Sequence, residues 1–422
     1  MISAMPASSD PPGVLSFEDA RRVVDEHALR VSPAATEEVD LLAANGRVLA
    51  ETVVADRDIP PFSRSTRDGY ALQASDLVEV PSEFEVVGEI KAGQRTNEFP
   101  SRLKSGQAVS IMTGAPVPDG ADAVVMVEYT SQEGGRVQVL RKAAAGENVV
   151  LRGAEAKEGV KLLGAGDRLS EAVIALAASV GRGRLAVYRR PRVAVLATGD
   201  EIVRVQDAPN TSQIRNSNTY SLAAQILAAG AQPVLLPIAP DESRQLRRLV
   251  EEGLGYELLL ITGGVSMGRY DLVEEVLSAI GAEFFFTGAK IQPGRPIVFG
   301  RCSTSTPAEA RYFFGLPGNP VSTMVTFELF ARPLIHALSG QKSRESNFLH
   351  ARLKSEVRVK PGLRRFLPAV LSGKFENSSV ELVAWHGSGD IAATARANCY
   401  AVIPPDREHI AEGEWIAIMM RS

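Results

Sequence analysis

The sequence predicts a multidomain α/β plus β fold in which a doubly wound α/β domain lies between β-rich segments. Its length, 422 residues, exceeds what a single hydrophobic core normally supports. Between Arg192 and about Gly340, short apolar runs of strand length alternate with helical patterns, which is typical of a largely parallel sheet. On either side, at 84–155 and from 341 onward, β-rich runs follow one another across turn residues.

Composition describes an ordinary globular protein and excludes several functional classes. Apolar residues make up 45% and charged residues 23%, with a net charge of -4, so the basic excess of a nucleic-acid-binding protein is lacking. The two cysteines, Cys302 and Cys399, fit a reducing cytoplasm better than a disulfide framework or a zinc cluster. The longest apolar stretch, Ala172 to Val180, is shorter than the roughly 20 residues that span a bilayer, so no membrane segment is expected.

The amino-terminal part is predicted to contain two helices and a β region. Ser16 precedes an amphipathic pattern and predicts a capped helix that ends before Pro33. The loop Ile59 to Tyr70, with the sequence I-P-P-F-S-R-S-T-R-D-G-Y, is rich in polar groups. Residues 84–155 predict a small barrel or sandwich, and Ser170 to Val180 predict one more helix.

The α/β segment and the carboxyl-terminal segment follow from their periodicity. Strands are expected near Val193–Ala197, Val234–Ile238, Leu258–Ile261, Ile297–Phe299 and Tyr312–Phe314. Helices are expected near Thr219–Ala229, Ser243–Gly253, Asp271–Ile280 and Val321–Leu338. After residue 340 the β-rich runs are separated by no long helical pattern, which predicts a terminal β-barrel.

Acidic side chains follow three predicted strands. Asp200 and Glu201 stand in T-G-D-E, Asp241 follows the second strand, and Asp271 follows the glycine turn of the third. Ligands of doubly wound sheets bind beyond the carboxyl ends of the strands, so these acids should share one rim. Nearby carboxylates repel one another, and a bound hard cation offsets that repulsion. The crowding therefore predicts a magnesium site. Asp241 and Asp271 also stand where helix N-caps belong, and taken singly each is better explained as a cap.

Three turns near these acids are candidate anion-binding features. They are the Gly263-Gly264 turn, the segment G-L-P-G-N-P at 315–320, and Q-P-G-R-P at 292–296, which contains Arg295. Backbone amides at helix starts and an arginine side chain hold phosphate or another tetrahedral oxyanion. Taken alone, a glycine-glycine turn is more typical of a tight loop and Arg295 of a solvated surface charge, and neither the Rossmann nor the Walker A spacing is present. Thr113 fits a turn hydroxyl as well as an anion contact, and His386 fits a turn residue better than a catalytic base.

Taken together, these stretches resemble the molybdopterin molybdenumtransferases, the MoeA family to which the enzyme domain of gephyrin also belongs. Six motifs carry the resemblance in order along nearly the whole chain. They are D-G-Y at 68–70, M-T-G-A-P at 112–116, T-G-D-E at 198–201, G-G-V-S-M-G at 263–268, Q-P-G-R-P at 292–296 and G-L-P-G-N-P-V-S at 315–322.

The resemblance implies a homodimer of four-domain chains. The expected boundaries are 1–50 with 156–188 for an elongated discontinuous domain I, 51–155 for a β-rich domain II, 189–340 for a molybdopterin adenylyltransferase-like α/β domain III, and 341–422 for a β-barrel domain IV. The implied reaction is magnesium-dependent hydrolysis of adenylylated molybdopterin, in which AMP leaves and molybdate is inserted. Molybdopterin adenylyltransferase, which catalyses the preceding step, is a candidate partner.

Site residues follow from the matched motifs. The resemblance implies that Asp200, Glu201, Asp241 and Asp271 serve the metal and the pyrophosphate. Further residues implied to bind pterin, phosphate or molybdate are Gly263, Gly264, Ser266, Arg295, Pro317, Pro320, Arg365 and Ser388. Asp68, implied to be catalytic, and Thr113 and Glu155 belong to domain II, which the family's dimer brings over the partner chain's cleft.

The sequence departs from the family pattern at Gln292, where many members have lysine, and at Arg295, which replaces a second lysine. Lys290 lies two residues before Gln292 and would point to the same face of an extended strand. Three other functions stay open: adenylyl transfer to molybdopterin, a nucleotide hydrolase built on the same α/β module, and a non-catalytic pterin-binding scaffold.

Overall fold

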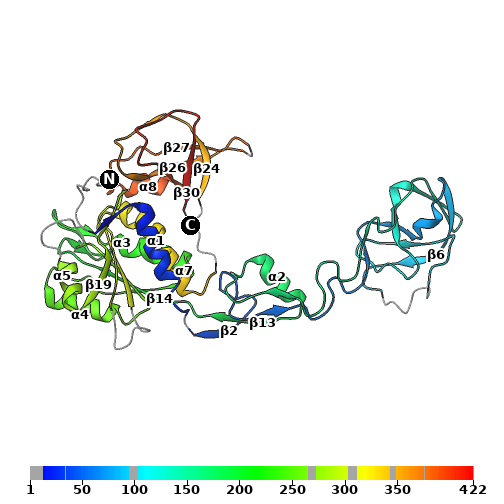
Figure 1. Ribbon diagram of the computed structural model, residues 1–422, viewed down its shortest axis with the longest axis horizontal. Coiled ribbons are helices and arrows are strands. Elements are labelled where there is room, and N and C mark those ends of the chain that lie inside the picture. Colours follow the sequence, from blue (N-terminus) through cyan, green and yellow to red (C-terminus); the bar gives the residue numbers. More distant parts are fainter. Residues whose placement is uncertain are drawn as a thin grey trace, which may run out of the picture.

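The computed structural model describes residues 13–33, 35–94, 102–264, 272–302, 311–342, 348–374 and 376–421. The molecule is elongated: an α/β part and a barrel lie together at one end, and a β-rich sheet lies at the other end beyond a narrow middle part (Figure 1). Within the described ranges, every helix is too short or too polar to span a membrane.

The narrow middle part is built from segments that are far apart in the sequence. Its strands form two antiparallel pairs, β2 (Thr36–Asp40) with β13 (Arg184–Tyr188) and β3 (Val53–Val54) with β12 (Lys161–Leu163). The predicted helix at Ser170 to Val180 is α2 (Glu171–Ser179), which lies beside them and is N-capped by Ser170. The chain therefore leaves this part towards the distal sheet and returns through it.

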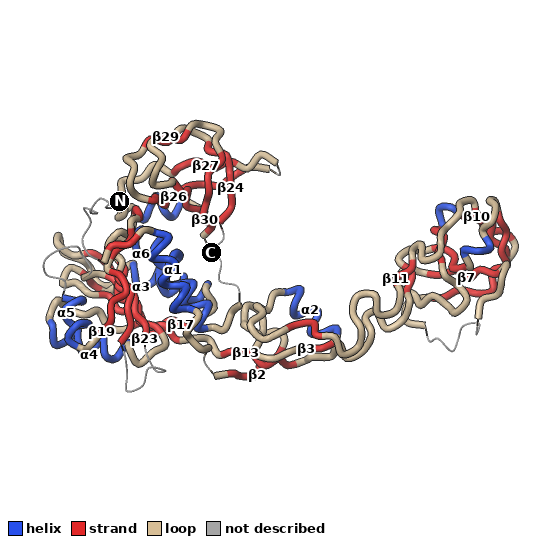
Figure 2. Tube along the Cα trace, viewed as in Figure 1, coloured by secondary structure: helices blue, strands red, loops and turns tan. Residues whose placement is uncertain are grey.

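The distal sheet has six strands in the order β8-β5-β7-β6-β10-β9, and only the β6–β7 pair is parallel. Figure 2 shows that it contains little helix. Two-stranded pairing of β4 with β11 connects it to the middle part. The bounds are β4 (Arg64–Ser65), β5 (Gly69–Leu72), β6 (Ser82–Ile90), β7 (Gln107–Ile111), β8 (Ala123–Met126), β9 (Thr130–Glu133), β10 (Arg136–Val139) and β11 (Val149–Val150).

The α/β part contains a six-stranded sheet in the order β17-β14-β18-β23-β22-β19. The first four strands in this order run parallel, and β22 and β19 add an antiparallel edge. The strands are β14 (Arg192–Ala197), β17 (Gln232–Leu235), β18 (Leu258–Thr262), β19 (Ala282–Phe286), β22 (Val298–Cys302) and β23 (Arg311–Leu316). The helices are α3 (Asn218–Ala228), α4 (Ser243–Gly253), α5 (Leu272–Ala279), α6 (Pro320–Thr326) and α7 (Arg332–Leu338).

Both faces of this sheet are buried, which explains the continuous apolar runs of its strands. On β14, Val193 and Val195 pack in the core formed with α3, α6 and α7, while Ala194 and Leu196 pack in a second core formed with α4 and α5. The alternation along one strand therefore supplies both hydrophobic layers. The amino-terminal helix α1 (Phe17–Ala28), capped by Ser16 as predicted, also packs on the first core.

Three details of the α/β segment differ from the sequence prediction. The strand expected at Val234–Ile238 is β17 and ends at Leu235. The helix expected at Val321–Leu338 is divided by a π-helical segment, Phe327–Ala331, because the chain there is buried all round and carries no periodicity that fixes one helix type. The edge strand β19 was not expected, because A-E-F-F-F lacks the clean alternation of a half-buried strand.

The carboxyl-terminal part is a closed barrel. Its sheet runs β21-β26-β27-β24-β30-β28, where β21 is Ile291–Gln292, and an additional pairing of β26 with β28 closes the ring. Its elements are β24 (Phe348–Leu353), β25 (Val357–Arg358), β26 (Arg364–Ser372), β27 (Ser379–Leu382), α8 (Ile391–Arg396), β28 (Cys399–Ile403), β29 (His409–Ile410) and β30 (Trp415–Met420). Closure leaves the ring without free strand edges.

Short strands join the barrel and the amino terminus to the α/β part. In the segment after β19, β20 (Gly288–Ala289) pairs with β1 (Val14–Leu15), and β21 (Ile291–Gln292) pairs with β26 of the barrel. A further short pair, β15 (Ile202–Val203) with β16 (Ile214–Arg215), lies next to the end of β14. The four domain boundaries expected from the sequence stay a prediction.

Candidate active site

A cleft of about 920 Å³ lies beyond the carboxyl ends of β14, β18 and β23. Its walls come from the turns that follow these strands, from the start of α3, and from the barrel segment at Gly389 and Ile391. The predicted site residues Glu201, Gly263, Gly264, Pro317 and Pro320 line it. The cleft therefore occupies the place where ligands of doubly wound sheets bind.

Glycines allow the turns of this cleft to approach one another closely. Gly263 has a φ of 91°, and a Cβ there would lie 2.2 Å from the carbonyl oxygen of Thr198. Gly199 has a φ of 139°, and a Cβ there would lie 2.4 Å from Oε2 of Glu201. A side chain at Gly263 would push its turn away from the Thr198 backbone, whereas one at Gly199 would displace the Glu201 carboxylate and would also be strained by the positive φ.

Two of the acidic turns meet directly. The backbone N–H of Asp241 donates a hydrogen bond of 3.0 Å to Oδ1 of Asp200, and Thr198 donates through Oγ1 to Oδ1 of Asp241 at 3.3 Å. Asp200, Asp241 and Glu201 are all exposed to solvent. The structure thus brings these three predicted acids together at one rim of the cleft.

The cap interpretation of Asp241 is wrong. The residue that caps α4 is Glu242, whose carboxylate accepts hydrogen bonds from the backbone N–H groups of Arg244 and Gln245. The carboxylate of Asp241 is therefore not used to start the helix. The predicted site residues Asp271 and Ser266 lie outside the described residues. Within the described ranges, no three His, Cys, Asp or Glu side chains form a group that could hold a metal by themselves.

The opposite wall is tied to the barrel by the turn before α6. Asn319 donates through Nδ2 to Oγ of Ser388 at 2.9 Å, and the backbone N–H of Val321 donates to the carbonyl of Ser388 at 3.0 Å. Pro320 occupies the first turn of α6, where a proline costs no hydrogen bond. The predicted contact Ser388 is thereby fixed next to the cleft wall at Gly389.

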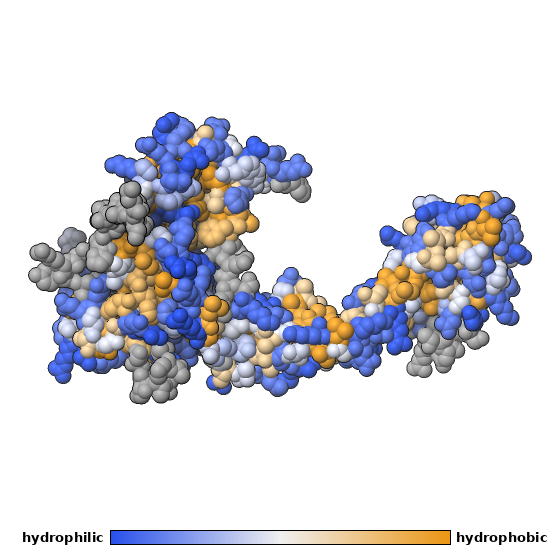
Figure 3. Space-filling model, viewed as in Figure 1, coloured by the Kyte–Doolittle hydropathy of each residue, from blue (hydrophilic) through white to orange (hydrophobic). Residues whose placement is uncertain are grey.

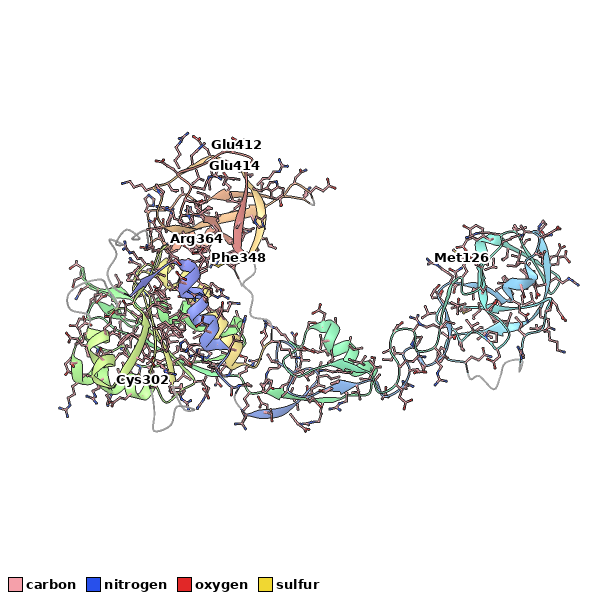
Figure 4. All side chains as sticks on the ribbon, viewed as in Figure 1. Met126, Cys302, Phe348, Arg364, Glu412 and Glu414 are labelled. Atoms are coloured by element: carbon pink, nitrogen blue, oxygen red, sulfur yellow. The ribbon has the colours of Figure 1, made fainter. Side chains whose placement is uncertain are left out.

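Arg365 is a nearly buried arginine at the junction of the barrel and the α/β part. The residue is 8% exposed, and its guanidinium donates to the carbonyl of Leu363 at 3.2 Å. Among the described residues no carboxylate pairs with it, and burial lowers the pKa of Arg365. Its neighbour Arg364, labelled at the same junction in Figure 4, pairs instead with Glu18. A buried cation without a protein counter-ion is a candidate anion ligand.

The Q-P-G-R-P segment lies beside Arg365. Gln292 on β21 stands in register with Arg365 on β26, so the two side chains leave the same face of the pair. Arg295 itself does not line the cleft, but the next residue, Pro296, does. Arg295 and Ser388 thus each precede a residue that lines the cleft, Pro296 and Gly389, and Arg365 lies across the β21–β26 pair from Gln292.

Three predicted site residues, Asp68, Thr113 and Glu155, do not line the cleft of their own chain. Asp68 accepts two hydrogen bonds on Oδ1, from the backbone N–H of Thr113 at 2.6 Å and from its hydroxyl at 2.9 Å. The backbone hydrogen bond from Thr113 lowers the pKa of Asp68. Glu155 forms an ion pair with Arg64 at 3.1 Å. Met126, whose strand position pairs with Gly69, marks this end in Figure 4, far from Arg364.

Polar residues at the start of α3 are cleft residues that the sequence analysis missed. Asn218 donates through Nδ2 to the carbonyl of Gly318 at 2.7 Å and to Oγ1 of Thr262 at 2.9 Å, which joins three turns of the cleft. Asn216 also lines the cleft and is 8% exposed. The run N-S-N immediately before an apolar helical pattern was the available signal, because such residues favour helix starts.

Three regions of the chain match known family descriptions. Residues 15–181 match the MoeA N-terminal region (domain I and II), residues 194–337 match a probable molybdopterin binding domain, and residues 350–420 match the MoeA C-terminal region (domain IV). Together these matches extend over nearly the whole chain.

Similar proteins agree with these matches. The chain is 36% identical over 398 residues to a molybdopterin molybdenumtransferase of Nostoc sp., covering 91% of this chain and 88% of that protein. It is 33% identical to a protein of the same name from Bacillus subtilis, covering 94% and 93%.

Solved structures give the same result for the fold. The crystal structure of the molybdopterin biosynthesis MoeA protein from Pyrococcus horikoshii OT3 superposes with a TM-score of 0.77 at 27% identity, covering 97% of this chain and 100% of that chain. A second structure of the Pyrococcus horikoshii protein superposes with a TM-score of 0.69 at 30% identity, covering 96% and 99%. The predicted fold class, a central α/β domain with a β-rich part and a terminal barrel, is confirmed. The chain belongs to the MoeA family of molybdopterin molybdenumtransferases, which act in molybdenum cofactor biosynthesis.

Proposed function

We propose that the cleft binds adenylylated molybdopterin, and that the chain releases AMP while it inserts molybdate into the dithiolene. The observation that carries this proposal is the hydrogen bond between the Asp200 and Asp241 turns at one rim of a cleft whose other wall comes from the barrel. A volume of about 920 Å³ is within the range of ligand sites that enclose a large organic molecule.

Magnesium is proposed to bind at the acid rim. Mg²⁺ is usually held by one or two protein carboxylates together with waters and substrate phosphates, so a rim of exposed acids fits it even without a complete protein cage. Asp200, Asp241 and Glu201 would hold it, with Asp271 from outside the described residues. When bound, the ion would neutralise charge on the phosphoanhydride oxygens.

The chain's own residues would then position and activate water. Glu201 lines the cleft with its carboxylate exposed, so we assign it the proton of the attacking water. The water oxygen forms a bond to one phosphorus, the phosphoanhydride bond breaks, and the bridging oxygen leaves on the other phosphoryl group with the bonding electron pair. The hydrogen bond from Thr198 orients Asp241, and that from Asp241 orients Asp200.

Molybdate is the substrate that the barrel side would bind. Arg365, whose guanidinium has no carboxylate partner among the described residues, would share the dianion with Arg295 and with the Ser388 hydroxyl. Asn319 holds that hydroxyl in place. Gln292 in register with Arg365 would contribute hydrogen bonds but no charge.

A homodimer would bring Asp68, Thr113 and Glu155 to the cleft of the partner. Two observations support it. Asp68 and Thr113 stand next to β5 and β7 of the distal sheet, which lies at the other end of the molecule from the α/β part (Figure 1). In addition, α2 consists almost entirely of apolar residues, yet Ala177 is its one buried residue, and hydrophobic residues gather over this middle part in Figure 3. A helix that is apolar all round needs a covering partner. A cytoplasmic location, and molybdopterin adenylyltransferase as the supplier of substrate, are further parts of the proposal.

The proposed reaction is tested by incubating the purified chain with adenylylated molybdopterin and Mg²⁺, with and without molybdate. AMP release and protein-bound molybdenum are measured together. We expect both when molybdate is present, and loss of AMP release after chelation of the metal. Consumption of ATP with metal-free molybdopterin, without insertion, would instead show the adenylyl transfer step.

A further inference from the structure

A cavity of about 190 Å³, which we call the junction cavity, lies where the α/β part meets the barrel. Its walls come from α3, from α6 and the π-helical segment that follows it, from β28, and from the end of the chain after β30. The lining residues that matter here are Ala224, Gln225, Met324, Glu328, Tyr400 and Arg421. It shares no lining residue with the cleft described above, so it is a separate site.

Tyr400 is a buried tyrosine whose hydroxyl has no protein partner. The residue is 1% exposed, and its hydroxyl makes no hydrogen bond with the described residues. The oxygen atom is not completely covered by protein, and because Tyr400 lines the junction cavity, its exposed surface faces this cavity. Burial raises the pKa of Tyr400 to about 12, so the hydroxyl keeps its proton at neutral pH and can donate it in a hydrogen bond. Buried tyrosine hydroxyls usually have a partner, which here a ligand in the cavity would supply.

Arg421 places a positive charge beside this hydroxyl. Its guanidinium carbon lies 5.9 Å from the centre of the Tyr400 ring. Nη1 of Arg421 donates to the carbonyls of Thr394 and Ala397, at the end of α8, at 2.5 and 2.7 Å. Among the described residues no carboxylate pairs with Arg421, and Nε and Nη2 donate to none of them, so these groups are available to a ligand. A guanidinium and a hydroxyl together are a donor set that binds an oxyanion.

Glu328, the acid in the wall of the junction cavity, is already neutralised. It is 7% exposed and forms an ion pair of 2.7 Å with Arg332. Gln225 donates through Nε2 to Oε1 of Glu328 at 2.7 Å and to the carbonyl of Met324 at 3.1 Å. Because the carboxylate is paired, it does not select a cation. Within the described part of the chain, the charge in this wall that lacks a counter-ion is that of Arg421.

We propose that the junction cavity binds a small organic carboxylate. The carboxylate group would accept hydrogen bonds from Arg421 and from the Tyr400 hydroxyl, and the hydrocarbon part would pack on Met324 and Ala224. A volume of about 190 Å³ lies below the range of sites that enclose drug-sized molecules, so the occupant has few atoms. One arginine fits a singly charged group better than a phosphate dianion, and an inorganic ion would leave the apolar wall uncovered. This inference does not depend on the function proposed above.

The test compares butyrate with butyramide and butylamine, which have nearly the same shape but are neutral and positively charged. Binding to the full chain is measured by ligand-observed NMR titration. We expect butyrate to bind at least ~10-fold more tightly than either of the other two, because hydrogen bonds from a charged donor contribute by that order. Equal affinity for butyrate and butyramide, or tighter binding of butylamine, overturns the assignment.

Two variants of the donors locate the binding site. Tyr400→Phe should weaken butyrate binding roughly 3- to 10-fold, as expected for one neutral hydrogen bond, and should leave the urea unfolding midpoint unchanged because the hydroxyl has no protein partner. Arg421→Gln should weaken it at least ~10-fold. Arg396→Gln is the matched control, because Arg396 is an exposed arginine of α8 that does not line the cavity, and it should bind butyrate as the wild-type chain does.

Ala224→Leu tests the cavity without removing a donor. The larger side chain should fill the space that the hydrocarbon part occupies and abolish butyrate binding. Arg421 also binds the carbonyls of α8, so the result for Arg421→Gln is interpreted together with the other two variants, which leave those hydrogen bonds intact. Wild-type affinity for butyrate in both Tyr400→Phe and Ala224→Leu overturns the assignment. AMP release, measured on the same variants, reports separately on the proposed function and should not change.

Discussion

Asp241 donates its backbone N–H to Oδ1 of Asp200 at 3.0 Å, so two acidic turns that lie 41 positions apart hold each other in place at the cleft rim. Because the donor is a main-chain group, the geometry survives substitution of the Asp241 side chain. The charge and the position of this rim can therefore be changed separately.

Asp241→Asn tests the charge of the rim. Asparagine keeps an oxygen acceptor for the Thr198 hydroxyl and loses the negative charge. We expect AMP release to fall by at least ~10-fold, with a higher Mg²⁺ concentration needed for half-maximal rate, since a removed ligand weakens the metal site. Steady-state rates measured across a magnesium titration give both quantities.

Glu251→Gln is the control for that experiment. Glu251 forms an exposed ion pair with Arg247 on α4, and such pairs contribute little to stability. Its magnesium dependence should equal that of the wild-type chain. Equal magnesium dependence of Asp241→Asn and the control would show that Asp241 takes no part in metal binding.

Arg365→Met tests whether Arg365 contributes to molybdate binding rather than to the free energy of unfolding. Removing a nearly buried cation and keeping a side chain of similar length should leave the free energy of unfolding unchanged or raise it, because burying a charge is costly. Molybdate binding should weaken about 10- to 100-fold, because the loss of hydrogen bonds from a charged donor reduces affinity by that order. Urea unfolding and equilibrium dialysis with molybdate measure the two effects. Parallel loss of stability and binding would identify Arg365 as structural.

Cys302 should make the free energy of unfolding decrease as the pH becomes alkaline. Burial raises the pKa of its thiol from 9.0 to about 11. The unfolded thiol therefore ionises first as the pH rises, so stability is lost above about pH 9 and the loss levels off near the folded pKa. Unfolding free energies measured across this range should fall less in Cys302→Ala than in the wild-type chain.

The burial of Cys302 can also be tested by the rate at which its thiol reacts. It lies on β22 in the α/β core, at the position labelled in Figure 4, and is 6% exposed. The folded chain should react slowly with a thiol reagent near neutral pH, and the unfolded chain should expose both cysteines. Fast reaction of Cys302 in the folded chain would contradict the assigned burial.

Mixed dimers test whether two chains share each active site. Asp68→Asn and Asp241→Asn should each have strongly reduced activity alone. When the two variants are mixed and exchange subunits, one cleft of each heterodimer combines an intact Asp241 with the partner's intact Asp68. Roughly a quarter of the wild-type activity should return, because half of the dimers are mixed and half of their sites are intact. No recovery, despite proven subunit exchange, would place Asp68 outside the site.

Much of the fold could be predicted from the sequence, because the spacing of apolar residues indicates which face of each element is buried. The helix Ser243–Gly253 was predicted with the observed bounds, since its apolar positions recur at helical spacing and its opposite face is charged. The segment Val321–Leu338 was predicted as one continuous helix, because a stretch buried on all sides gives no periodic signal that would reveal the π-helical segment.

The site was predicted less completely than the fold. The positions of Asp200 and Glu201 follow from the rule that strand ends carry ligands, and the structure places them at the rim. Two adjacent acids, Asp241 and Glu242, could each have capped α4. The hydrogen bonds of the Glu242 carboxylate show that Glu242 is the cap. The isolation of Arg365 from carboxylates is a property of three-dimensional packing, so no local pattern could show it.

The central claim is that acids on the strand side and cations on the barrel side serve one cleft. Anomalous diffraction at the molybdenum absorption edge, from crystals soaked in molybdate, tests it most directly. The account predicts a molybdenum peak within hydrogen-bonding distance of Arg365 and Ser388 in the wild-type chain, and no peak there in Arg365→Met. A peak at the acid rim, or one that persists unchanged in the variant, would contradict it.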